Sequence, residues 1–77
     1  MKYRLSIMTT LGLFFAKRLI NRSELSRKTG IKVSRLTVLS TKENSRLFAF
    51  ELHLIALALD MTTQELDDIL FGDIKLP

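Results

Sequence analysis

Apolar residues recur three or four positions apart along most of the chain, and the residues between these stretches are of the types that begin and end helices. Asn21 can cap a helix, and Glu24 follows three residues later, at the spacing of a capping box. Gly30 can end the same helix, because glycine adopts the left-handed backbone conformation at little cost. The pattern therefore predicts a short helix over residues 22–29.

The same reasoning predicts four more short helices. Thr10 can cap the first of them, and Thr62 and Glu65 form a second capping box that begins the last. The expected helices are one that follows Thr10 and others over residues 22–29, 33–41, 48–59 and 63–72. Residues 42–46 are polar and predict a loop, whereas residues 2–7 fit a short extended piece. We therefore expect one all-α domain over residues 1–77, with no linker and no internal repeat.

The composition fits a small folded domain and excludes several other classes. Apolar residues make up 47% of the 77 positions and charged residues 26%, a balance that excludes intrinsic disorder. There is no cysteine, so disulfides and thiolate metal sites are excluded, and a single histidine provides no cluster for a metal. No apolar run has the length of a membrane span, which favours a cytoplasmic location.

The first sixteen residues share some features with a secretory signal, because they have a basic start and an apolar middle. A cleavage after Ala16 would require a small residue two positions earlier, where Phe14 stands. The same stretch is also needed as the first helix of the domain, so we favour the helix over the signal.

The net charge of +4 conceals a division of the chain into a basic and an acidic part. Residues 1–46 contain eleven Lys or Arg against two Glu, a net charge of +9. Residues 47–77 contain one Lys against six Asp or Glu, a net charge of −5. Such a division suits a domain that binds a polyanion on one face, although basic residues that only solvate a surface would give the same count.

The segment over residues 22–41, RSELSRKTGIKVSRLTVLST, resembles the helix-turn-helix of the lambda-repressor/Cro-type (XRE-like) family. Six positions carry the resemblance. Ser26 is small where the second helix crosses, and Gly30 allows the sharp turn. Four apolar residues clamp the two helices at a fixed angle: Leu25, Ile31, Leu36 and Leu39. The later stretch LHLIALALDMTTQEL also resembles the family, so the likeness covers residues 11–70. It implies a five-helix, lambda-repressor-like DNA-binding domain. Residues 72–77 form a C-terminal tail, and for residues 1–9 an extended N-terminal arm, a strand and a lid are all compatible with the sequence.

This sequence departs from the family pattern in a few places. Lys32 stands where Ser, Thr or Asn usually caps the second helix of the motif. Ser40 replaces a frequent Glu, and the loop that follows is one residue longer than usual. These departures affect the loop and its contacts with phosphates rather than the fold.

In the family, the second helix of the motif lies in the major groove and its first helix crosses the DNA backbone. The resemblance therefore implies four base-reading residues, namely Val33, Ser34, Thr37 and Val38. None of them has the guanidinium or amide that binds G or A through two hydrogen bonds, whereas their methyl and hydroxyl groups suit thymine. We expect important T·A pairs and a shallow penalty of about 1 kcal/mol for each wrong base.

Most of the affinity is expected to come from phosphates. Basic and neutral donors flank the reading residues, and the expected phosphate contacts are Arg22, Ser23, Lys32, Arg35, Thr41, Lys42, Asn44 and Arg46. Four further basic residues fit either a contact or a solvated surface: Lys17, Arg18, Arg27 and Lys28.

The sequence contains no constellation typical of an enzyme. His53 has no partner at ligand spacing, and the acidic residues near Glu65 fall in the first turn of a helix, where they complement its dipole. We expect no catalysis, no metal, no cofactor and no small-molecule ligand.

The predicted fourth helix has more apolar residues than one buried face requires. A second line of apolar residues, together with the C-terminal tail, forms the expected homodimer interface: Phe50, Leu54, Leu57, Met61, Phe71, Ile74 and Leu76. The alternative is that the first helix and the tail cover this line within one monomer. The resemblance implies symmetric dimers that bind two half-sites one turn of DNA apart.

Two functions agree with these features. The first is a sequence-specific transcriptional regulator, a Cro-like repressor that acts on double-stranded DNA in the cytoplasm, in association with the nucleoid. The second is a protein-interaction module on the same fold, antitoxin-like or accessory, whose acidic and apolar C-terminal half binds a partner protein. The reading residues without Arg, Asn or Gln favour the second function, and the basic N-terminal half favours the first.

Overall fold

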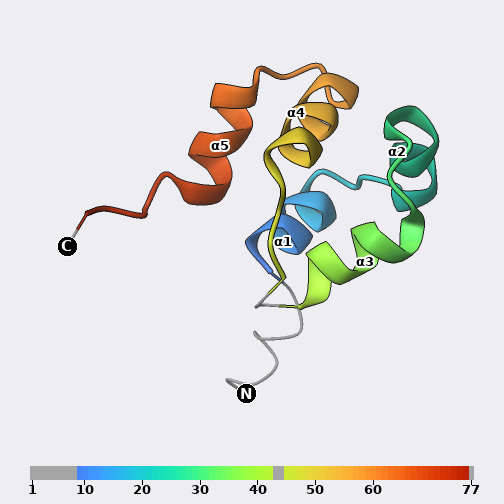
Figure 1. Cartoon of the computed structure of the whole chain (residues 1–77), viewed down its shortest axis with the longest axis horizontal. Helices are drawn as coiled ribbons and strands as arrows, with labels where there is room; N and C mark the ends of the chain where they lie inside the picture. Colours follow the sequence, from blue (N-terminus) through green and yellow to red (C-terminus); the bar gives the residue numbers. More distant parts are fainter. Residues whose placement is uncertain (1–8, 43–44, 77) are drawn as a thin grey trace.

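The computed structural model describes residues 9–42 and 45–76, which form five helices (Figure 1). They are α1 (Thr10–Lys17), α2 (Arg22–Thr29), α3 (Val33–Thr41), α4 (Ala49–Ala58) and α5 (Thr63–Phe71). No strand is present in these two ranges, so the expected all-α class is confirmed. The possible extended piece over residues 2–7 lies outside the described residues. None of the described helices is long and apolar enough to cross a bilayer.

The ends of α2 and α5 follow the local signals of the sequence. The Asn21 side chain accepts hydrogen bonds from the Ser23 and Glu24 N–H groups, at 2.8 and 3.1 Å. The Glu24 carboxylate pairs with Arg27, so the structure shows the Asn21 half of the predicted capping box. At the start of α5, Thr62 and Glu65 form both halves of theirs.

The cap of α1 is Thr9, and the prediction of Thr10 was wrong by one residue. The Thr9 hydroxyl accepts from the Gly12 N–H at 3.0 Å and donates to the Leu39 carbonyl at 2.7 Å. The Thr9 N–H also donates to the Ser40 carbonyl at 2.9 Å. Two adjacent threonines have the same capping ability, and contacts with the end of α3, thirty residues away, select between them.

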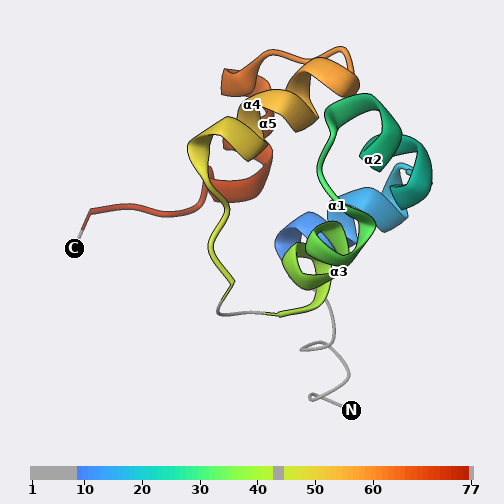
Figure 2. The same ribbon diagram turned by 45° about the vertical axis from the view of Figure 1, so that its right-hand side comes forward.

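Helices α1 and α3 approach each other so closely at Gly12 that no side chain fits there. A Cβ at this position would lie 2.2 Å from the carbonyl oxygen of Ser40, in the last turn of α3. Figure 2 shows α3 lying against α1. Together with the two Thr9 hydrogen bonds, this contact fixes the C-terminal end of α3 on α1.

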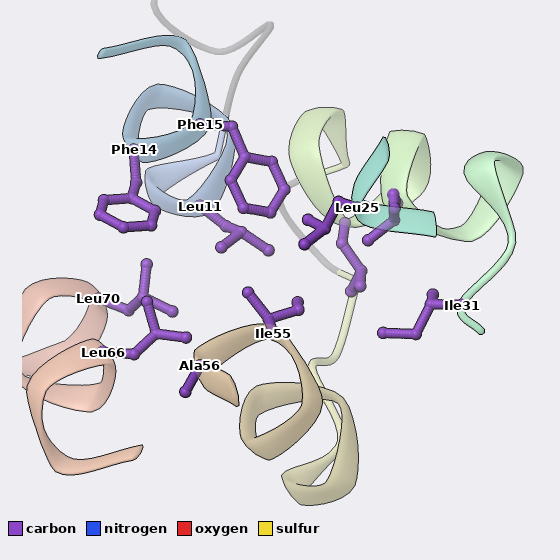
Figure 3. Close-up of a cluster of buried hydrophobic side chains, with 11 residues drawn as sticks. Leu11, Phe14, Phe15, Leu25, Ile31, Ile55, Ala56, Leu66 and Leu70 are labelled. Carbon is purple, nitrogen blue, oxygen red and sulfur yellow. The ribbon is translucent and has the colours of Figure 1, made fainter. Parts of the chain in front are cut away.

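All five helices contribute to one apolar core (Figure 3). Eleven buried apolar residues form it: Leu11, Phe14, Phe15, Leu25, Ile31, Leu36, Leu39, Ile55, Ala56, Leu66 and Leu70. The side chains of Leu36, Ile55 and Leu66 are fully buried. All four apolar residues expected to clamp the helix-turn-helix are in this core, namely Leu25, Ile31, Leu36 and Leu39. Their burial confirms the interpretation of their spacing.

The turn between α2 and α3 depends on Gly30. Its φ of +80° lies in the left-handed region, and its N–H donates to the Ser26 carbonyl at 2.8 Å. No atom outside its neighbours lies within 4 Å of a Cβ built at this position. Glycine is therefore favoured here by backbone conformation alone.

Candidate nucleic-acid interface

Helix α3 has one exposed face and one buried face. The four residues predicted to read bases, Val33, Ser34, Thr37 and Val38, are all exposed. Their spacing of one, three and one places them on one side of the helix. Leu36, Leu39 and Ser40 are buried on the other side. The exposed side therefore presents two isopropyl groups and two hydroxyl groups to solvent.

The N-terminal end of α3 has no side-chain cap. Lys32 occupies the cap position with an extended backbone, and its side chain makes no capping hydrogen bond. The first N–H groups of a helix have no partner within it, so those of α3 are available to water or to an acceptor on a ligand. The departure noted at Lys32 thus leaves a helix end with positive partial charge beside an exposed lysine.

The predicted phosphate contacts within the described residues lie at the start of α2, in α3 and at its start, and in the linker from α3 to α4. Arg22 and Ser23 are exposed in the first turn of α2, and Lys32 is exposed at the start of α3. Lys42 and Arg46 are exposed in the linker from α3 to α4. Thr41 is half-buried, and its hydroxyl donates to the Thr37 carbonyl at 2.8 Å. Asn44, also predicted, lies outside the described residues.

Arg35 differs from the other predicted phosphate contacts, because its guanidinium donates hydrogen bonds to groups of the protein itself. Its Nε and Nη2 donate to the two carboxylate oxygens of Glu51, at 2.8 and 2.9 Å. Nη2 also donates to the Arg46 carbonyl at 2.6 Å, and the guanidinium carbon lies 5.3 Å from the centre of the Phe48 ring. Within the ion pair, the Glu51 side chain is only 4% exposed and is therefore shielded from solvent.

The ion pair keeps the Glu51 carboxylate charged. The hydrogen bond from Arg35 lowers the pKa of Glu51 below its ordinary value of 4.5, against the opposing effect of burial, and the Phe48 N–H lowers it further. The hydrogen bond with Glu51 correspondingly raises the pKa of Arg35. A depressed carboxyl pKa adds stability at pH values above 4.5, and this is lost as the pH falls through the lowered value.

Two other titratable groups make hydrogen-bonding contacts on α4 and α5. His53 is exposed on α4, and its Nδ1 lies 3.1 Å from the hydroxyl oxygen of Thr63 on α5. Asp68 accepts from the Gln64 side chain at 3.0 Å within α5. No group of three or more potential metal ligands occurs in residues 9–42 and 45–76.

The predicted dimer interface divides into exposed and half-buried residues. Phe50 and Leu57 on α4 are 61% and 62% exposed, and Phe71, Ile74 and Leu76 are exposed at the C-terminal end. Leu54 and Met61, in contrast, are half-buried and pack against the core. Five of the seven residues of the predicted interface are therefore exposed on a single chain.

A family model for the Cro/C1-type HTH DNA-binding domain matches residues 10–69. The chain belongs to this family. The match runs from the first residue of α1 into α5 and confirms the resemblance inferred from the motif. Comparisons with curated proteins and with solved structures give no match. The Cro/C1-type domain is accordingly a DNA-binding one, with the helix-turn-helix motif expected in α2, the Gly30 turn and α3.

Sequence reasoning missed the ion pair between the buried Glu51 and Arg35. At the sequence level Glu51 falls in the first turn of a helix, where an acid is explained by the helix dipole. Its pairing with Arg35, sixteen residues earlier, depends on how α3 and α4 pack, and no local pattern indicates it.

Proposed function

We propose that the Cro/C1-type domain is a Cro-like transcriptional repressor that binds specific sites in double-stranded DNA as a homodimer. The exposed face of α3 carries the proposal, because it holds four adjacent side chains that no contact with the protein interior explains. The buried residues of α3 and the contacts of Thr9 with its C-terminal end support a fixed orientation. We propose no catalytic role, and we place its action on DNA in the cytoplasm, in association with the nucleoid.

In this proposal, α3 lies in the major groove and Val33, Ser34, Thr37 and Val38 face the base edges. The isopropyl groups of valine and the methyl group of threonine favour contact with the C5-methyl group of thymine. Hydroxyl groups donate or accept and discriminate less sharply between bases than two parallel hydrogen bonds do. The proposed operator therefore contains T·A pairs and tolerates single changes.

The backbone contacts of the proposal are Arg22 and Ser23 at the start of α2, Lys32 at the start of α3, and Thr41, Lys42, Asn44 and Arg46 after the reading residues. Arg22 and Ser23 combine a charge and a hydroxyl with the positive end of the helix dipole, which suits a phosphate. Exposure of Arg22, Lys32, Lys42 and Arg46 supports their availability.

Replacement of Arg22 or Lys42 by alanine should weaken binding to all DNA sequences alike. Each loss of a phosphate contact should reduce the slope of log affinity against log salt concentration by about 1, because fewer counterions are released. Fluorescence anisotropy with labelled duplexes of selected and random sequence, from low to high salt, measures both effects. Asp60→Asn, which changes an exposed charge outside this surface, is the matched control. A changed sequence preference with an unchanged slope would show that the residue contacts a base instead.

The homodimer rests on the apolar surface of α4, α5 and the C-terminal end. Five large apolar side chains in this part of the chain are at least 40% exposed: Phe50, Leu57, Phe71, Ile74 and Leu76. Exposed apolar residues that form one patch are typical of an interaction site. Leu54 and Met61 pack against the core and would lie at the edge of such an interface. A dimer also binds two half-sites at once, which increases the affinity over that of one domain.

The same apolar surface supports one alternative, a protein-interaction module that binds a partner protein rather than DNA. The lack of Arg, Asn and Gln among the reading residues also favours it. Binding of random duplex DNA at low salt separates the two functions. Absence of any binding under these conditions would favour the interaction module, because the electrostatic contribution to DNA binding is greatest there.

A further inference from the structure

One guanidinium in the domain connects three separate parts of the chain next to the exposed face of α3. Arg35 lies in α3 beside the reading residue Ser34. Its partners are the carboxylate of Glu51 in α4, the carbonyl of Arg46 in the linker, and the ring of Phe48 at the start of α4. The recognition helix, the linker and the next helix are thus joined at one side chain.

These partners occupy most of the N–H donors with which Arg35 would bind a phosphate. A guanidinium has five N–H donors, and Nε and Nη2 together provide three of them. Each of these three donors has an acceptor within 2.9 Å in the protein. The Arg35 side chain is 31% exposed, and the Glu51 carboxylate neutralises its charge. A neutralised and internally bonded guanidinium releases few counterions from DNA.

Both oxygens of the Glu51 carboxylate also accept hydrogen bonds within the protein. The same oxygen that accepts from Arg35 Nη2 also accepts from the Phe48 N–H, at 3.0 Å, and so caps the first turn of α4. At the other end of the linker, the Ser45 N–H and hydroxyl donate to the Lys42 carbonyl, at 3.0 and 2.7 Å. The described parts of the linker are therefore held by hydrogen bonds at both ends. Ser45 binds the Lys42 carbonyl just after α3, and Arg35 binds the Arg46 carbonyl shortly before α4 begins.

We infer that Arg35 is a positioning residue and that, with Glu51, it holds Arg46 where its side chain reaches the DNA backbone. The inference rests on the proposed DNA contacts, which do not include Arg35, and it corrects the sequence-based expectation that Arg35 contacts a phosphate itself. Arg46 is exposed while its carbonyl is bound to Arg35, so the backbone is fixed and the charged side chain remains available to DNA.

Glu51→Gln distinguishes a positioning Arg35 from a phosphate-binding Arg35, because the two roles predict changes of opposite sign in the affinity for DNA. Removal of a negative charge should increase the affinity for DNA if Glu51 only neutralises a phosphate-binding Arg35. If the pair positions Arg46, we expect the affinity to fall about tenfold, because the neutral amide holds the guanidinium more weakly. Glu24→Gln is the matched control, because this exposed acid on α2 is paired with Arg27 and not with the linker. It should leave the affinity unchanged or raise it slightly.

Arg35→Lys provides a second variant that keeps the charge. A lysine has no planar fork and cannot bind both Glu51 oxygens and the Arg46 carbonyl in the same way. We expect the salt slope to fall by about 1 although the net charge is unchanged, because the Arg46 contact is lost. A phosphate-binding Arg35 would instead give a lysine variant with an unchanged slope.

The closing experiment is a double-mutant cycle of Glu51→Gln and Arg46→Ala, measured by anisotropy on a labelled duplex at low and high salt. Circular dichroism establishes the folded fraction of each variant, and Arg35→Lys replaces Glu51→Gln in the cycle if the latter does not fold. Coupling is expected, so that Arg46→Ala has little further effect once Glu51 is changed. Additive losses, or a higher affinity of Glu51→Gln, would overturn the positioning role alone. A wild-type domain that binds no duplex at low salt would overturn the proposed function, and the positioning role with it.

Discussion

Replacement of Gly12 by alanine should lower the free energy of unfolding by about 3 kcal/mol, at the upper end of the usual cost of overpacking. The added Cβ would lie 2.2 Å from the carbonyl oxygen of Ser40, and this atom belongs to a helix backbone that cannot rotate aside. The clash is relieved only if α1 and α3 separate, which stretches the Thr9 hydrogen bonds to Leu39 and Ser40. A domain of this size has a total stability of about 4–12 kcal/mol, so the loss is large.

Urea unfolding followed by circular dichroism measures this effect, and Gly30→Ala is the matched control. Position 30 has open space around a Cβ, but its φ of +80° disfavours alanine. The control should therefore cost only about 1 kcal/mol, from backbone conformation alone. Equal costs at the two positions would contradict the close packing of α1 on α3.

Leu57→Glu should weaken the proposed homodimer by about a hundredfold in dissociation constant, because a charge would be buried in its apolar interface. Leu57 is 62% exposed in the single chain, so its replacement leaves the core intact. Sedimentation at tens of micromolar protein, without DNA, should give a dimer for the wild type and a monomer for the variant. The affinity for a two-half-site operator should fall in parallel, because each domain then binds alone.

Leu19→Glu makes the same chemical change at a leucine that is 90% exposed and lies outside the predicted interface. This control should remain a dimer. A wild-type domain that sediments as a monomer would contradict the homodimer, and dissociation by both variants would show that the interface lies elsewhere.

The helices of this domain could be predicted from sequence because the signals that end them are local. Each of these signals acts on groups within four residues of itself. Asn21 and Gly30 therefore set the bounds of α2 from the sequence alone, and Thr62 and Glu65 set the start of α5. The start of α1 could not be settled this way. Thr9 and Thr10 are chemically identical, and only contacts with Leu39 and Ser40 distinguish them.

The candidate site could be predicted in outline but not in the role of each cation. From sequence, Arg35 is a basic residue next to a base-reading residue, as expected of a phosphate contact. Its actual partner, Glu51, lies on a different helix, so no local pattern reveals the ion pair. Periodicity shows which residues share a face of a helix, but it does not show how many neighbours the helix has. For the same reason, Leu54 and Met61 were expected in the dimer interface and lie half-buried against the core.

The division of charge along the chain agrees with the location of the candidate site. The basic residues expected to contact phosphates all precede position 47, and four of them are exposed: Arg22, Lys32, Lys42 and Arg46. Six of the eight acidic residues follow position 47, among them Glu51, which binds Arg35, and Glu65, which caps α5. A net charge of +4 thus understates the charge that this surface would present to DNA.

Selection of bound sequences from a random duplex library tests the central claim, that α3 reads DNA, most directly. We expect enriched sites with T·A pairs, a penalty of about 1 kcal/mol for each wrong base, and inverted half-sites about 10 base pairs apart. Substitution of Thr37 by alanine should change the preferred bases and leave the spacing of the half-sites unchanged. Failure to enrich any sequence, or G-dominated half-sites with sharp preferences, would contradict the account.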